Sequence, residues 1–174
     1  LNNKKHKKWI YWNKNGQKTE EINYNNGVHH GSHIKWFGEK SDQHKKFHIN
    51  YKDGNKDGNW HHWYSSGVDS LKATYLNGEK DGHWIWWRKN GLKDKEGFYK
   101  KEKKHGLWTI WNDSTGSAYH KLHEETYVND AIDGKVTKWY KEGDLDRQGI
   151  MRGKEKEGEW TYCCLLYTSP SPRD

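Results

Sequence analysis

Tryptophan and glycine recur along this chain at fixed spacings, and this repetition constrains the fold more than any other feature. A glycine ends each unit, and successive unit-ending glycines are 27, 24, 24, 28 and 24 residues apart. They are Gly31, Gly58, Gly82, Gly106, Gly134 and Gly158. Self-similarity at a constant period of roughly 20–50 residues is typical of repeat proteins, in which each unit packs mainly on its neighbours. The sequence therefore predicts a repeat array rather than a conventional globular core.

Two aromatic positions follow each unit-ending glycine. The first slot lies two residues after it and holds Trp9, Trp60, Trp84, Trp108 and Trp160, with His33 and Val136 in the remaining units. The second slot lies five residues after it and holds Trp12, Trp36, Trp63, Trp87, Trp111 and Trp139. Eleven of the twelve tryptophans fall on these slots, and only Trp86 does not. This register indicates that one structural unit is copied along the chain.

A turn glycine and a tyrosine complete the unit. The turn glycine comes four residues after the second slot, at Gly16, Gly67, Gly91 and Gly143, with Gly116 one place late and Lys40 in the corresponding place of the second unit. The tyrosine precedes the closing turn, at Tyr24, Tyr51, Tyr75, Tyr99 and Tyr127, with Met151 in the sixth unit. An example of the closing turn is the segment from Asn77 to Gly82. We interpret each unit as two strands and two glycine-containing turns.

The residue types between the turns favour strands. Trp, Tyr, Thr and Ile are good strand residues, glycine adopts the positive φ that tight turns need, and proline is absent from the repeats. We predict an all-β fold, an elongated single-layer antiparallel meander of repeated β-hairpins with strands of about 5–6 residues. Slots three residues apart, such as Trp60 and Trp63, face opposite sides of a regular strand. Either both faces carry aromatic ladders or a bulge rotates one ring, and the pattern leaves both alternatives open.

The composition agrees with a thin fold. Hydrophobic residues make up 30% of the chain and charged residues 32%, while aromatic residues alone reach 15%. One large ring buries about 150–250 Å², so that few rings replace many aliphatic side chains. We therefore expect stripes of Trp and Tyr to hold the fold together.

The two ends of the sequence differ from the array. Cys164–Asp174 has no kinship with the repeats and resembles the translation of a sequencing adapter, so we expect it to be non-native. Residues 1–8 form a partial leading repeat or a linker, and residues 9–163 hold about six repeats plus a truncated seventh. Because Leu1 is not Met, we expect both natural ends to be missing. Cys163 occupies the seventh second slot, and we hypothesise that the native residue there is Trp.

The repeat pattern resembles a known family. Gly58-Asn59-Trp60-His61-His62-Trp63 and His105-Gly106-Leu107-Trp108 are similar to the variant MORN repeat, and the similarity runs from Trp9 to Trp160. Bacterial proteins with this variant are often assigned to the YwqK-family antitoxins of toxin–antitoxin systems. The resemblance implies an extended β-sheet array with a binding role, and a toxin as one partner to consider.

Catalytic and metal chemistry finds little support. Adjacent histidines such as His29-His30 and His61-His62 point to opposite faces of a strand, which is poor geometry for one metal ion, and His120 with His123 is no better. Glu20-Glu21 and Glu124-Glu125 have the appearance of solvated edges beside lysines. No nucleophile triad or phosphate-binding loop is present. We predict no catalytic residues, no metal and no cofactor.

Three binding functions remain. We favour a scaffold for another protein, because Trp and Tyr surfaces are typical interaction hot spots. In this hypothesis the second-slot rings are mostly structural, and exposed rings at Trp60, Trp84, Trp108 and Trp86 contact the partner. The alternatives are a module for anionic phospholipid surfaces, based on the net charge of +7 and the lysine-rich turns, and a carbohydrate- or cell-wall-binding repeat. Nucleic acid is disfavoured, because the lysines cluster in turns rather than in one patch.

The tryptophans and the cysteine content also allow other interpretations. In the competing structural interpretation, every tryptophan serves only to hold the sheet together. The low cysteine content is compatible with the cytoplasm, which we favour, and also with a secreted or cell-surface location.

Overall fold

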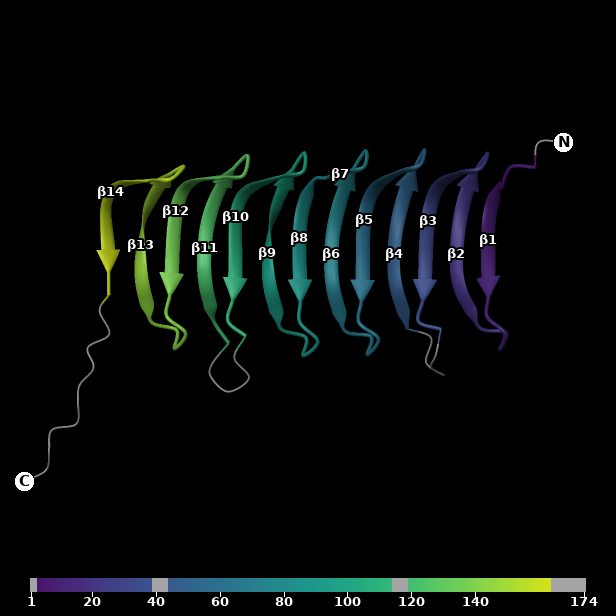
Figure 1. Ribbon diagram of the computed structural model, residues 1–174, viewed down its shortest axis with the longest axis horizontal. Helices are drawn as coiled ribbons and strands as arrows, with labels where there is room; N and C mark the ends of the chain where they lie inside the picture. Colours follow the sequence, from purple (N-terminus) through teal and green to yellow (C-terminus); the bar gives the residue numbers. More distant parts are fainter. Residues whose placement is uncertain (1–2, 39–43, 114–118, 164–174) are drawn as a thin grey trace, which may run out of the picture.

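The fold is one long antiparallel β-sheet. The computed structural model describes residues 3–38, 44–113 and 119–163, so the predicted non-native tail, Lys40 and Gly116 lie outside the described residues. Fourteen strands follow one another in chain order, each hydrogen-bonded to its neighbours, except that the short strand β7 lies beside β6 in line with β8. Figure 1 shows the strands in a single row with β1 and β14 at opposite ends. The predicted all-β, single-layer hairpin meander is confirmed.

The strands are β1 (Lys7–Trp12), β2 (Lys18–Asn25), β3 (Val28–Trp36), β4 (Lys45–Lys52), β5 (Asn55–Trp63), β6 (Asp69–Leu76), β7 (Glu79–Lys80), β8 (Gly82–Trp87), β9 (Lys93–Lys100), β10 (Lys103–Trp111), β11 (Lys121–Val128), β12 (Ala131–Trp139), β13 (Leu145–Arg152) and β14 (Glu155–Tyr162). Of the described residues, none forms a helix with the length and apolarity that a membrane crossing requires.

The closing turns are shorter than predicted, and the strands are correspondingly longer. Only two residues separate β4 from β5, since Lys52 pairs with Asn55 across Asp53 and Gly54, which both have positive φ. Two successive residues with positive φ form the type I′ turn, whose twist matches that of paired strands. Most strands therefore have eight or nine residues. The prediction of strands of about 5–6 residues is wrong.

The unit-ending glycines lie inside strands rather than in turns. On β4 and β5, Ile49 pairs with Trp60 and Tyr51 pairs with Lys56. Three residues around Gly58 therefore stand opposite one residue of β4, which is a β-bulge. The backbone at Gly58 has φ 90°, in the left-handed region that favours glycine. The prediction that these glycines belong to the closing turns is corrected by this register.

The leading residues follow the same plan as the later repeats. Lys7 lies two residues before Trp9, where other units have their glycine, and its φ is 60°. The carbonyl oxygen of Lys5 accepts a hydrogen bond from the Gly27 amide at 2.7 Å, as the carbonyl of Lys56 does from the Gly78 amide at 2.7 Å. Residues 5–8 thus occupy the places of a repeat.

The two slots lie on opposite faces of the sheet. The Trp60 and Trp84 rings approach each other on one face, with centroids 6.3 Å apart. Trp63 instead stacks beside His61, an alternate residue of the same strand, with centroids 3.7 Å apart. Of the two alternatives that the spacing leaves open, the one with aromatic rings on both faces is correct. We name the faces the first-slot face and the second-slot face.

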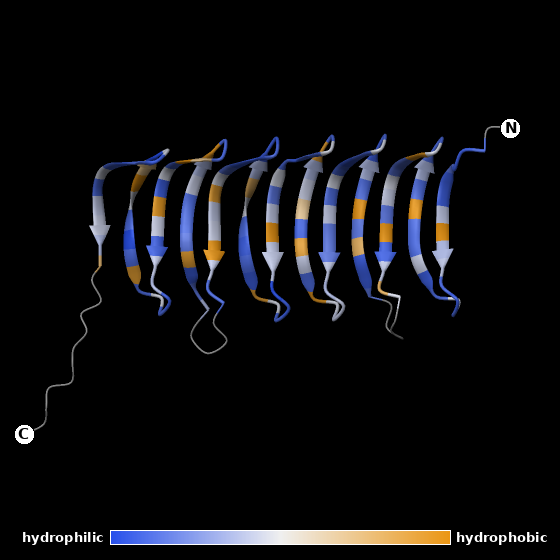
Figure 2. Cartoon of the chain, viewed as in Figure 1, coloured by the Kyte–Doolittle hydropathy of each residue, from blue (hydrophilic) through white to orange (hydrophobic). Residues whose placement is uncertain are grey.

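The core lies on the first-slot face. Ala73, Tyr75 and Trp84 form its centre, with Trp60 and Trp86 packed against it. Figure 2 shows isolated hydrophobic segments on the strands and no continuous apolar layer, which agrees with a core built from large rings.

The first-slot rings that were expected to be exposed are buried at the centre of the array. Trp84 and Trp108, in the first slot, are only 4% and 5% exposed. In the second slot Trp12 is 59% exposed, and Trp63 and Trp87 are half-buried, although Trp111 is buried. The reason is that the first-slot rings lie in the middle of the strands and have rings on both sides, whereas the second-slot rings lie at the strand ends.

Candidate binding surface

Lysine side chains cover the aromatic rings of the first-slot face. The Lys56 Nζ atom lies 4.8 Å from the ring centroid of Trp60 and 4.8 Å from that of Tyr75. An ammonium group within about 6 Å of a ring centroid is attracted by the π electrons of the ring. Lys56 therefore caps a pair of rings contributed by two neighbouring strands, β5 and β6.

The same cluster occurs in the next two units. Lys80 lies 5.7 Å from the Trp84 ring and 5.1 Å from the Tyr99 ring. Lys104 lies 4.6 Å from the Trp108 ring and 4.7 Å from the Tyr127 ring. We call the three clusters together the lysine row; it consists of Lys56, Lys80 and Lys104 with their paired rings Trp60, Tyr75, Trp84, Tyr99, Trp108 and Tyr127.

Lysine and first-slot tryptophan vary together within the chain. Lys5 covers Trp9, and Lys156 covers Trp160, at 4.9 Å in both cases. Where the first slot holds His33 or Val136, the lysine position holds His29 or Ile132. The lysine is thus a component of the aromatic cluster, because it is present where the indole ring is present.

The β-bulge explains how residues four apart in sequence, which share a face, come close enough to touch. Lys56 and Trp60 pair with Tyr51 and Ile49, which are only two residues apart on β4. The bulge around Gly58 therefore brings the lysine side chain next to the indole ring. The lysine backbone is held by the following hairpin, since the carbonyl oxygens of Lys80 and Lys104 accept hydrogen bonds from the amides of Glu102 and Asp130 at 2.9 and 3.0 Å.

The tyrosines of the lysine row stay neutral at physiological pH. Burial raises the pKa of Tyr75 to about 12 and also raises the pKa of Tyr99. Burial, together with a hydrogen bond from the Tyr127 hydroxyl to the Glu125 carboxylate at 2.6 Å, raises the pKa of Tyr127. The positive charge of the row is therefore carried by lysine beside uncharged phenol rings.

The lysines of the row have few carboxylate partners. Among the salt bridges of the described residues, Lys80 takes part in one, with Glu102 in an exposed turn at 3.2 Å, whereas Lys56 and Lys104 take part in none. On the second-slot face, lysines pair with carboxylates at the same place in four units: Lys18 with Glu21, Lys72 with Asp69, Lys93 with Glu96 and Lys121 with Glu124. The pair formed by Asp69 and Lys72 has the order of its charges reversed. The first-slot face also carries ion pairs, Lys35 with Glu20 and Lys138 with Glu125, but Lys56 and Lys104 of the lysine row belong to none of them.

The second-slot tryptophans also have lysine neighbours. Lys18 lies 5.0 Å from the Trp36 ring, Lys72 lies 5.3 Å from the Trp87 ring and Lys93 lies 5.2 Å from the Trp111 ring. These lysines belong to the ion pairs described above. Like the lysines of the row they lie over tryptophan rings, but each has a carboxylate partner and lies on the opposite face. Substitutions of these lysines are therefore matched controls for substitutions in the lysine row.

The carboxylates predicted to be solvated edges are strand residues with partners. The Glu20 carboxylate lies 2.8 Å from His33 Nε2 on the first-slot face. Glu21, on the other face, lies 2.7 Å from Lys8 Nζ, and hydrogen bonds from Lys8 and Lys18 lower its pKa. Glu124 and Glu125 likewise point to opposite faces, because adjacent strand residues alternate. These four glutamates have lysine neighbours as predicted, but they are half-buried strand residues and not solvated edges.

The histidines are packed individually rather than gathered. His29 contacts the Tyr24 and Tyr51 rings, His61 lies 2.7 Å from the Asp69 carboxylate, and His62 lies 2.6 Å from the Ser70 hydroxyl. Within the described ranges, no group of three His, Cys, Asp or Glu residues could hold a metal ion.

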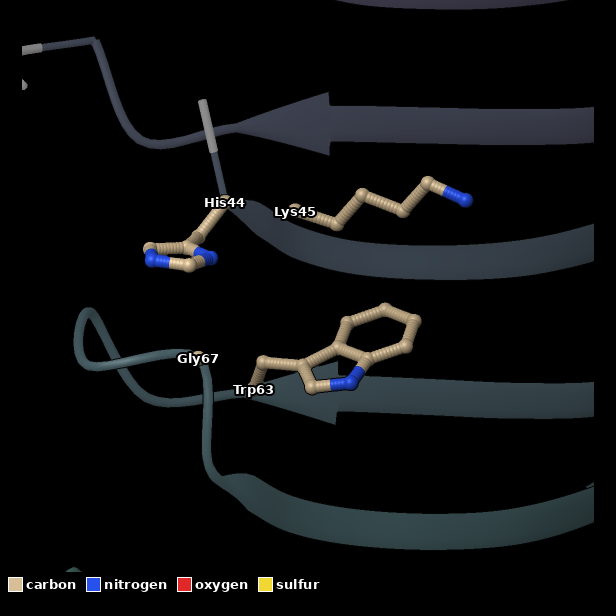
Figure 3. A pocket seen from close by; sticks show the side chains of 4 residues that line it. All are labelled: His44, Lys45, Trp63 and Gly67. Carbon is tan, nitrogen blue, oxygen red and sulfur yellow. The ribbon is translucent and has the colours of Figure 1, made fainter. Parts of the chain in front are cut away.

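A hollow at the loop end of the second-slot face is explained by packing. His44, Lys45, Trp63 and Gly67 line a space of about 230 Å³ (Figure 3). The His44 ring lies beside Gly67 of the next unit, where an added Cβ atom would come within 3.0 Å of the ring. His120 and Gly143 repeat this contact at 3.4 Å. The turn glycine therefore makes room for the side chain of the preceding unit.

A second hollow marks the end of the lysine row. It has a volume of about 220 Å³ and is lined by Ile132, Val136, Met151 and Trp160, among others. It lies where Val136 replaces a tryptophan and Ile132 replaces a lysine. The smaller side chains leave space on the first-slot face.

Acid is expected to destabilise the fold in two stages. Burial lowers the pKa of His29, His48, His61, His62 and His123. Because their folded pKa values lie below the unfolded value of about 6.5, stability is complete above that pH and falls as the pH drops through it. The lowered pKa values of Glu21 and Glu102 add a second loss below about pH 4.3. Melting temperatures should therefore be lower at pH 5.5 than at pH 7.5.

A variant tests the first stage. His29→Ile places at this position the residue that another unit has at Ile132, and it should reduce the difference between the two melting temperatures. Equal melting temperatures of the parent chain at both pH values would contradict the assignment.

The structure brings all four predicted binding residues together, but not as an exposed aromatic patch. Trp84 packs against Trp60 and Trp86, and Trp86 packs against Trp108 at 5.9 Å. What the prediction missed is the lysine above each first-slot ring. The recurrence of lysine two residues before the unit-ending glycine, at Lys56, Lys80, Lys104 and Lys156, was the available signal.

Comparisons with protein families and with curated proteins add no assignment to this geometry. No family model matches the chain, and no curated protein matches it significantly.

Proposed function

We propose that this chain is a non-catalytic repeat scaffold that binds another protein through its first-slot face. The observation that carries the proposal is the lysine row, in which three successive units present a cation above a Trp–Tyr pair. Interaction surfaces are enriched in aromatic residues, and complementary charge directs the choice of partner. The partner surface should therefore be acidic.

The rigidity of the surface supports the same proposal. Each lysine carbonyl is tied to the next hairpin, and the Trp84 and Trp108 indole nitrogens donate to the carbonyl oxygens of Thr74 and Phe98, both at 3.0 Å. Groups that are already ordered lose little conformational entropy on binding. A preformed row of this kind suits recognition better than it suits catalysis, which needs titratable groups converging on one point.

The resemblance to variant MORN repeats fits this function. We propose that the chain is a MORN-type array, and that a role like that of the YwqK-family antitoxins, with a toxin as the bound protein, is one form of the function. A neighbouring toxin gene would support that form. The scaffold proposal itself depends on the lysine row and not on this assignment.

The experiment uses the parent chain and two triple variants as bait to capture proteins from an extract of the source organism. Binding of the purified partner to each chain is then measured. The variant Lys56→Gln, Lys80→Gln, Lys104→Gln should lose the partner. The control Lys18→Gln, Lys72→Gln, Lys93→Gln removes lysines that also lie over tryptophans, but on the second-slot face, and should keep it. Specific binding that both variants retain would contradict the choice of face.

A second candidate is an anionic membrane surface. The lysines of the row favour it, since lysines near an anionic leaflet contribute about 1 kcal/mol each. Sedimentation with phosphatidylserine vesicles at low salt separates the candidates. A chain that sediments with the vesicles and captures no protein would replace the scaffold proposal with this one.

A further inference from the structure

We propose that the lysine row recognises an acidic peptide segment in the polyproline II conformation, with a carboxylate at every third residue. The inference rests on the proposed function and specifies the part of the partner that is bound. Its basis is a match between two distances. One is the spacing of the lysines across the sheet, and the other is the spacing of every third side chain along the peptide.

The spacing of the lysines follows from the sheet. Lys56, Lys80 and Lys104 lie on β5, β7 and β10, and one strand, β6 or β9, separates each from the next. Neighbouring strands are about 4.7–4.9 Å apart, so equivalent positions two strands away are about 9.4–9.8 Å apart. A ligand that runs across the strands therefore meets a cation at this interval.

Polyproline II helices have the corresponding period. They contain 3 residues per turn with a rise of about 3.1 Å, so every third side chain projects from the same side at intervals of about 9.3 Å. In a β-strand, residues three apart face opposite sides. An extended strand therefore cannot present carboxylates to all three lysines with this spacing, whereas a polyproline II segment can.

The tyrosines between the lysines suit the residues between the carboxylates. Tyr75 and Tyr99 stand between successive lysines across the sheet, and Tyr127 follows Lys104. Proline-rich segments dock on surfaces lined by aromatic rings, because their conformation is already extended and little entropy is lost on binding. Prolines at the intervening positions would thus pack mainly on the half-buried Tyr99 and Tyr127 rings, because Tyr75 is only 7% exposed.

The sparse charge of the row favours a peptide over nucleic acid. One strand of B-DNA offers a phosphate about every 3.4 Å along its axis, which is close to three phosphates per lysine. A peptide with one carboxylate per turn offers one charge per lysine. The Glu102 carboxylate beside Lys80 is no obstacle, because it belongs to an exposed turn, where ion pairs are weak.

The test uses synthetic peptides of equal composition and charge. One consists of four Glu-Pro-Pro units, and the other has the four glutamates in a block followed by the eight prolines. Titrations followed by tryptophan fluorescence and calorimetry should show that the block peptide binds roughly tenfold more weakly. Changing all three lysines of the row to glutamine should weaken binding of the Glu-Pro-Pro peptide on the order of a hundredfold, about fivefold for each lysine. The control variant Lys18→Gln, Lys72→Gln, Lys93→Gln should bind as the parent chain does.

Arginine substitution guards against a loss of fold. Lys56→Arg, Lys80→Arg, Lys104→Arg keeps both the charge and the contact with the rings, and it should keep binding of the Glu-Pro-Pro peptide. Far-ultraviolet circular dichroism verifies that each variant retains its sheet.

Three outcomes would overturn the inference. If both peptides bind equally through the lysine row, the face is a docking surface without periodic recognition, and the proposed function survives. If neither peptide binds while the chain still captures a protein through these lysines, the inference fails alone. If only phosphatidylserine vesicles bind and no protein is captured, the inference and the proposed function fail together.

Discussion

Replacing Trp84 with alanine is expected to lower the free energy of unfolding by about 3–5 kcal/mol. The ring is 4% exposed and contacts Trp60, Tyr75, Trp86 and Tyr99, with centroid distances of 5.2–6.3 Å. Its removal abolishes these contacts and the hydrogen bond to the Thr74 carbonyl oxygen. In a single layer no second sheet can collapse into the space, so the loss should be large. Urea denaturation followed by circular dichroism measures it.

Trp12→Ala is the control for this change. Trp12 is a second-slot ring that is 59% exposed in the outermost strand β1, and its replacement should cost less than about 1 kcal/mol. Equal losses for Trp12→Ala and Trp84→Ala would show that the first-slot face is not the core of the array.

The second large effect is expected from Gly97→Val. Gly97 lies on β9 directly beneath the indole of Trp108, and a Cβ atom there would come within 2.2 Å of the ring. The ring must move, which disturbs its contact with Tyr99 at 5.0 Å and its hydrogen bond to the Phe98 carbonyl oxygen. Overpacking of this kind costs about 1–3 kcal/mol. The φ of Gly97 is not in the left-handed region, so steric overlap rather than backbone strain is the cause.

A double-mutant cycle isolates that overlap. In the background Trp108→Ala, the ring is absent and the added side chain occupies part of the space that the ring left. Gly97→Val should then be close to neutral, and the two changes together should cost less than the sum of the single changes. Additive costs would mean that the valine acts through something other than the ring of Trp108.

The sequence carries this pairing of small and large residues, although spacing by itself does not reveal it. Gly149 lies under Trp160 as Gly97 lies under Trp108, with an added Cβ atom 2.4 Å from the ring. Ala73 and Ile49 hold the equivalent place in other units. They lie on the two strands that flank β5, and each pairs directly with Trp60. These pairs become visible only when the strand register is known, because they join residues on different strands.

Periodicity predicted the hairpin architecture because the physics of one unit is local. Glycine at the turns, strand-forming residues between them and the absence of proline each act over a few residues, so a 24-residue period such as that from Gly58 to Gly82 was enough to predict an all-β meander. The same argument predicted aromatic rings in register along the sheet, and the contacts of Trp60, Trp84 and Trp108 agree with it.

The tertiary structure decided which residues share a face, and with it the character of the surface. Lys80 was assigned to a closing turn and Trp84 to an exposed ring, because residues four apart on a regular strand share a face but lie too far apart to pack together. The bulge at Gly58 inserts extra residues on one side of a pair of strands, and this brings Lys56 close to Trp60 and places the ammonium group over the indole ring. Such a bulge depends on the pairing with β4, which is a relation between strands. The chain alone therefore determined the unit and its number of copies, while the pairing of neighbouring units determined where the charge lies.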